Sequence, residues 1–115
     1  MPTVLILIAS DPRTSHRPAE AIRIAAGVGV WEKTDMIVYL RETAVLALRE
    51  DTEGFVDEEN YTRYLAMVRD SGRPIYVQRG AALLPKAGET SLNFAEVDDD
   101  ELARLAAEST YILRF

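Results

Sequence analysis

Cysteine is absent from the 115 residues of this chain. Its absence excludes disulfides, thiolate metal sites, iron–sulfur clusters and thiol nucleophiles. Long apolar runs are absent as well. The longest, residues 4–9, is too short to cross a membrane, and it lacks the basic leader and small-residue cleavage site of a signal peptide. We therefore expect a cytoplasmic protein with no membrane partner.

An excess of positive charge is also missing, because the net charge is -6. Residues 50–59 contain six acids and no base, and the rest of the chain carries equal numbers of both. Nucleic-acid binding needs clustered Lys or Arg, so this composition argues against that partner. We interpret the acidic stretch as a solvated loop. A hydrophobic fraction of 48% in a chain of this length predicts one globular domain.

Apolar runs alternate with helical patterns along the chain. The run at residues 4–9 has no polar alternation, which is typical of a strand buried on both faces of a parallel sheet. Strands are predicted at residues 4–9, 35–40, 75–78, 92–97 and 110–115, and helices at 18–30, 43–48, 58–70, 81–84 and after a cap at Asp98. This order predicts an α/β three-layer sandwich around a mostly parallel five-stranded sheet.

Ligands of such sheets bind beyond the carboxyl ends of the strands, near the point where the strand order reverses. Three loops fall there, at residues 10–17, 41–43 and 78–80. They contain the residues that we predict to bind a small anionic ligand: Ser10, Asp11, Arg13, Ser15, His16, Arg17, Arg41, Gln78 and Arg79. The simpler interpretation is that Ser15 caps a helix and that the arginines of the first loop are only solvated.

No complete catalytic or metal-binding motif is present. The pair Gly27 and Gly29 lies at a helix end rather than after a strand, so it is not a dinucleotide fingerprint, and no P-loop occurs. The acids of residues 98–101 suit a helix N-terminus better than a calcium loop. We therefore expect no metal and no cofactor. An alternative is a small hydrolase or isomerase using His16 and Asp11 as an acid/base pair, although no nucleophile accompanies them.

Aromatic residues leave one ambiguity. Tyr61 and Tyr64 fall on the apolar face of a predicted helix, and Trp31 follows the first helix. These side chains suit either core packing or a subunit interface, and the sequence does not separate the two.

The ordered motifs resemble the DsrE-like family, which includes the DsrE/DsrF/DsrH and TusB/TusC/TusD sulfur-relay subunits. The resemblance lies in residues 4–12, 17–27, 37–46 and 74–83, and so covers most of the chain. It implies a cytoplasmic protein with a parallel five-stranded sheet that assembles into homo-oligomers (dimers, trimers or hexamers).

The resemblance also implies a site. Active members accept persulfide sulfur on a cysteine in the loop after the third strand, which corresponds here to Gln78, Arg79 and Gly80 within a residue or two. A persulfide relay requires a thiolate, and none of these residues supplies one. We therefore expect a non-catalytic, cysteine-less relative that serves as a binding or scaffold protein. The alternative is a partner subunit that complements a cysteine-bearing paralogue.

Overall fold

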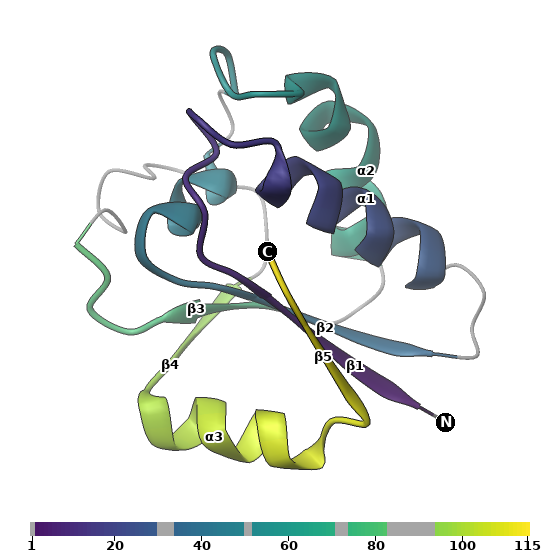
Figure 1. Ribbon diagram of the computed structural model, residues 1–115, viewed down its shortest axis with the longest axis vertical. Helices are drawn as coiled ribbons and strands as arrows, with labels where there is room; N and C mark the ends of the chain where they lie inside the picture. The colour runs from purple at the N-terminus through teal and green to yellow at the C-terminus, as the bar shows by residue number, and fades with distance from the viewer. Residues whose placement is uncertain (1, 30–33, 50–51, 71–73, 83–93) are drawn as a thin grey trace.

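A five-stranded parallel sheet organises the chain (Figure 1). The computed structural model describes residues 2–29, 34–49, 52–70, 74–82 and 94–115. The strand order is β4-β3-β2-β1-β5, and every neighbouring pair is parallel. The strands are β1 (Thr3–Ile8), β2 (Asp35–Leu40), β3 (Ile75–Gln78), β4 (Phe94–Val97) and β5 (Tyr111–Arg114). The predicted α/β fold around a five-stranded parallel sheet is confirmed.

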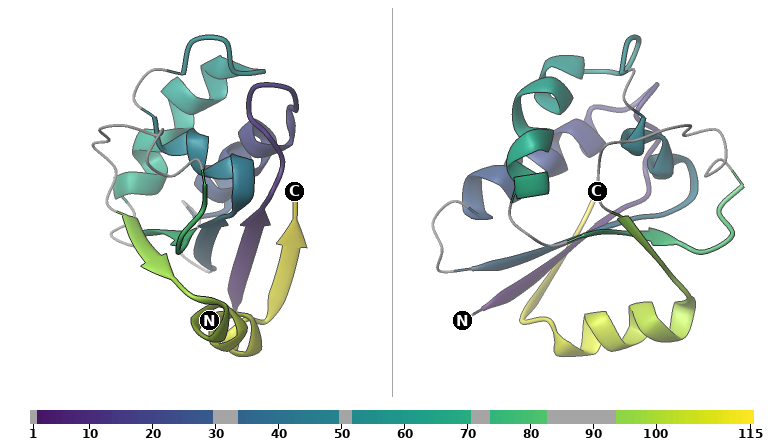
Figure 2. Two further views of the ribbon diagram at one scale, coloured as in Figure 1. Left: turned by 90° about the vertical axis from the view of Figure 1, so that its left-hand side faces the viewer. Right: turned by 180° about the vertical axis from the view of Figure 1, so that it is seen from behind.

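Helices cover the two faces of the sheet unequally. One face carries α1 (Arg17–Gly29), α2 (Glu58–Asp70) and the 3-10 helix η1 (Glu42–Leu48). Of the helices in the described residues, α3 (Asp99–Glu108) alone lies against the other face. Figure 2 shows the same three layers from the side and from behind. The sequence of β1 requires this arrangement, because its alternate residues must all be buried, some under α1 and some under α3.

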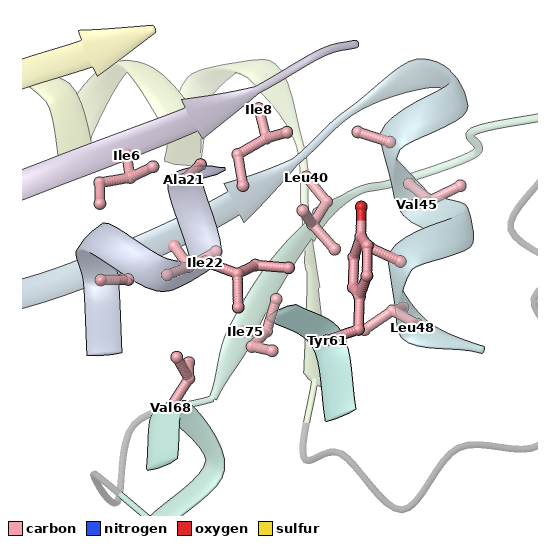
Figure 3. Close-up of a cluster of buried hydrophobic side chains, with 14 of the residues drawn as sticks. Ile6, Ile8, Ala21, Ile22, Leu40, Val45, Leu48, Tyr61, Val68 and Ile75 are labelled. Atoms are coloured by element: carbon pink, nitrogen blue, oxygen red, sulfur yellow. The ribbon is translucent and has the colours of Figure 1, made fainter. Parts of the chain in front are cut away.

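The larger core lies under α1, α2 and η1 (Figure 3). Ile6 and Ile8 of β1 point into it and are fully buried, and Tyr61 of α2 is only 2% exposed there. Of the two interpretations of Tyr61, core packing is therefore confirmed. The smaller core, under α3, is formed by Leu5, Tyr39 and their neighbours.

The chain connections place a switch point beside β1. From β1 the chain moves outward through β2 and β3 to β4, and α3 then carries it back across the opposite face to β5, on the other side of β1. Where the connecting helices of two adjacent strands lie on opposite faces of the sheet, a crevice forms at the carboxyl ends of those strands. In this sheet the crevice lies between β1 and β5.

Several boundaries differ from those predicted. The last strand is shorter, at Tyr111–Arg114, and the short second helix is a 3-10 helix. Residues 92 and 93 of the predicted strand 92–97 lie outside the described residues. Residues 81 and 82 of the predicted helix 81–84 are not helical, and the rest of that segment lies outside the described residues, as does Trp31. In the part of the chain that the structure describes, no helix is long and apolar enough to cross a membrane.

Candidate functional site

A pocket of about 660 Å³ opens at the switch point. Polar and charged side chains from the ends of three neighbouring strands and from the start of α1 meet there. The lining residues are Leu7, Ala9, Ser10, Arg17, Arg41, Glu42, Arg114 and Phe115. The pocket therefore occupies the position at which open α/β sheets bind their ligands.

Strand register brings the three arginines of this pocket together. Arg41 follows directly after β2, and its main-chain N–H donates to the carbonyl oxygen of Ile8 at 3.0 Å. Arg114 ends β5 opposite Leu7 of β1. Arg17 begins α1, and its Nη2 donates to the main-chain oxygen of Arg114 at 3.2 Å. Residues distant in sequence thus place three positive charges around one opening.

Arg41 is the most constrained of the three. Its Nε is buried and has no hydrogen-bond partner among the described residues. A buried donor without an acceptor costs about 1–3 kcal/mol, and nearby like charges add repulsion. The side chain is therefore held with one of its donors unsatisfied among the described residues.

Glu42 supplies the negative charge of the pocket and has a strained backbone. Its φ is +54°, in the left-handed region that non-glycine residues rarely adopt. Its N–H donates to Oε1 of Gln78 at 3.0 Å, which links the end of β2 to the end of β3. Strained conformations of this kind concentrate at ligand-binding sites, where the surrounding structure holds them.

The first predicted loop is mostly self-contained. The Asp11 carboxylate accepts from Nη2 of Arg13 at 2.8 Å and from its Nε at 3.0 Å. These bonds hold the pKa of Asp11 below its ordinary value. Ser15 accepts from the N–H of Arg17 at 3.1 Å, and His16 is exposed on the surface. Of residues 10–16 in this loop, Ser10 alone lines the pocket.

Those contacts bear on the acid/base alternative. A carboxylate bound by Arg13 with a lowered pKa is a weak general base. No hydrogen bond between Asp11 and His16 is present among the residues described. The hydrolase hypothesis stays a prediction that these contacts do not support.

Arg79 lies away from the pocket. It faces the start of α3, with Nη1 at 3.7 Å from Asp98 Oδ2 and Nη2 at 3.5 Å from Glu101 Oε1. Asp98 and Glu101 also form a capping box, in which the Glu101 N–H donates to Asp98 Oδ1 at 2.8 Å. This arrangement confirms the predicted cap at Asp98.

The predicted ligand residues therefore divide into two groups. Ser10, Arg17 and Arg41 line the pocket, whereas Asp11, Arg13, Ser15, His16, Gln78 and Arg79 do not. Arg114 was missed. Its signal was an arginine following three apolar strand residues, but its relevance depends on β5 lying beside β1, which the sequence does not reveal. In the described parts of the chain, no group of three or more His, Cys, Asp or Glu residues could hold a metal ion.

A second depression lies on the α3 side of the same strand ends. It is a groove of about 380 Å³ between α3 and the sheet, lined by Leu5, Leu7, Arg41, Asp99, Leu102, Ala103, Ala106, Ile112 and Arg114. Arg41 and Arg114 line both this groove and the switch-point pocket. The two spaces therefore share two of their charged walls.

Comparison with known proteins supports the fold. No family model matches the chain, and no curated protein matches it in sequence. Among solved structures, the ychN protein from E. coli superposes with a TM-score of 0.80 at 20% sequence identity, and the similarity covers 100% of both chains. Together with the parallel five-stranded sheet, this similarity shows that the chain has the DsrE-like α/β fold.

Proposed function

We propose that this chain is a non-catalytic binding protein that holds a small organic anion in the switch-point pocket. The observation that carries the proposal is the convergence of Arg17, Arg41 and Arg114 on one opening, with the buried Nε of Arg41 unpartnered among the described residues. Guanidinium groups bind carboxylates and phosphates through paired hydrogen bonds. An anion would reduce the repulsion between the arginines.

Sulfur transfer is not part of this proposal. A relay needs a thiolate nucleophile, and the chain contains no cysteine. Gln78, which the resemblance places near the family's cysteine, accepts instead from the N–H of Glu42. This residue supports the wall of the pocket rather than a covalent intermediate.

Isothermal titration with acetate, butyrate and inorganic phosphate at low ionic strength tests the proposal. We expect saturable binding of at least one probe, and a loss of tenfold or more in affinity for Arg41→Met and for Arg17→Gln. The matched control is Arg79→Gln, which removes an arginine that lies outside the pocket. Absence of binding by all three probes, or an equal loss in the control, would overturn the proposal.

We also propose that the chain forms a homo-oligomer through the edge strand β5. Tyr111 is 62% exposed and Leu113 40% exposed, which is unusual for large apolar side chains on a strand. Both lie on the face of β5 opposite to the α3 groove, since Ile112 between them lines that groove. Sedimentation at micromolar concentration is expected to show an oligomer that Leu113→Lys dissociates, and a monomeric wild type would refute it.

A cysteine-bearing paralogue as a partner remains a separate prediction. Its test is affinity purification of the tagged chain from native extract, followed by identification of any partner present in near-stoichiometric amount. A partner of this fold that carries a cysteine would support it, and recovery of the chain alone would count against it.

A further inference from the structure

The switch-point pocket and the groove under α3 share two lining residues, Arg41 and Arg114. An anion held by them therefore lies at the end of the groove nearest the carboxyl edge of the sheet. We infer that the ligand is amphipathic, with a singly charged carboxylate at the arginines and an unbranched apolar tail in the α3 groove. This inference rests on the proposed function and adds the chemical class of the ligand.

Strand geometry explains why the groove is apolar along the strands and charged at the carboxyl edge of the sheet. Alternate residues of a strand share a face, so Leu5 and Leu7 of β1 face α3, as do Ile112 and Arg114 of β5. Leu5 and Ile112 pair deeper in the groove, whereas Arg114 pairs with Leu7 and is the last residue of β5, at the carboxyl edge of the sheet. The sheet therefore presents an apolar floor that ends in a positive rim.

Small residues on α3 leave the space open. Ala103 and Ala106 line the groove where longer side chains would fill it, and Leu102 forms the adjoining wall. From Asp99 to Ala106 the helix advances about 10 Å, which accommodates a tail of roughly six to eight carbon atoms. Half-exposed Ile112 closes the opposite side.

The charges of the walls select the head group. Arg17, Arg41 and Arg114 face two acids across the joined spaces, Glu42 in the pocket and Asp99 at the top of the groove. The side chains of the lining therefore carry one more positive charge than negative, before the chain-terminal carboxylate of Phe115 is counted. A monocarboxylate meets less repulsion from the acids of the lining than a phosphate dianion does.

The test is titration of the full chain with acetate, butyrate, hexanoate, octanoate and dodecanoate. Burial of each methylene in an apolar groove tightens binding by about two- to fourfold. We expect affinity to rise through hexanoate to octanoate and to level off once the tail exceeds the groove. Equal affinities along the series would overturn the inference that an apolar tail binds in the α3 groove, but they would leave the proposed anion site intact. No binding by any member would overturn the inferred carboxylate ligand, and the proposed anion site is overturned as well if inorganic phosphate also fails to bind.

Substitutions in the groove test whether the rise in affinity with tail length arises from contacts in the groove. Ala103→Phe places a ring in the groove from an exposed helix position, and it is expected to abolish the dependence on chain length while acetate binds as before. The control, Ala107→Phe, makes the same change at an exposed residue of α3 that does not line the groove, and should retain that dependence. Ile112→Thr removes apolar wall without filling space and should weaken octanoate severalfold more than acetate. An unchanged chain-length series in both groove variants would refute the assignment.

Discussion

Replacement of Arg41 by methionine should stabilise the fold while abolishing anion binding. Methionine keeps an unbranched apolar stem but removes the buried Nε that has no partner among the described residues. It also removes one of the three positive charges around the pocket. Stability and binding should therefore change in opposite directions, which is the expected behaviour of a residue retained for a ligand.

The size of the effect follows from the burial of the Arg41 Nε. An unsatisfied buried donor costs about 1–3 kcal/mol, and part of that gain is lost because methionine does not reproduce the packing of the guanidinium. We expect a net increase of about 1 kcal/mol in the free energy of unfolding, or about 3–6 °C in Tm. At ten times its Kd, a bound anion stabilises the wild type by about 1.4 kcal/mol, so saturating ligand should cancel or reverse the difference.

Urea denaturation followed by circular dichroism measures both quantities. Wild type and Arg41→Met are compared in a low-salt zwitterionic buffer, with and without butyrate, and the midpoints are interpreted only if the m-values agree. A loss of 1 kcal/mol or more in the variant without butyrate would refute the reasoning, because it would mean that the Arg41 guanidinium is satisfied in the free protein.

Three further predictions concern the fold. Tyr61→Phe should raise the free energy of unfolding by up to about 1 kcal/mol, because the buried hydroxyl of Tyr61 has no partner among the described residues. Thermal denaturation measures this change. Asp98→Ala should lower it by about 1 kcal/mol in urea, because the cap of α3 is lost. The hydrogen bonds from Arg13 lower the pKa of Asp11 below its ordinary 3.8. The stability that this contact adds to the fold is therefore fully present above pH 3.8, and it is lost as the pH falls through the lowered pKa. Asp11→Asn should therefore be less stable than wild type at pH 7 and equal to it in strong acid.

The fold was largely predictable because each element has a local signal. The unbroken apolar run of β1 indicates burial on both faces, and Asp98 with Glu101 three residues later is a capping box. Strand ends were less predictable, since pairing with neighbours decides where a strand stops. β5 is a strand only over Tyr111–Arg114, the residues that pair with β1 from Val4 to Leu7.

The site was only partly predictable, because it depends on which strands are neighbours. Arg17 and Arg41 follow from the rule that ligands lie at carboxyl strand ends, and both line the pocket. Arg114 could not be assigned without knowing that β5 pairs with β1. Arg13 and Arg79 have the same local sequence signal as Arg17, but contacts with Asp11 and with the cap of α3 occupy them.

We propose that the end of the sheet between β1 and β5 binds an organic anion through three arginines. The most direct measurement is titration of ¹⁵N-labelled protein with hexanoate, followed by amide chemical shifts. We predict saturable shifts that are largest at Ser10, Arg17, Arg41, Glu42 and Arg114, with little change at Arg13 and Arg79. Shifts centred on Arg13 or Arg79, or none at saturating hexanoate, would contradict the account.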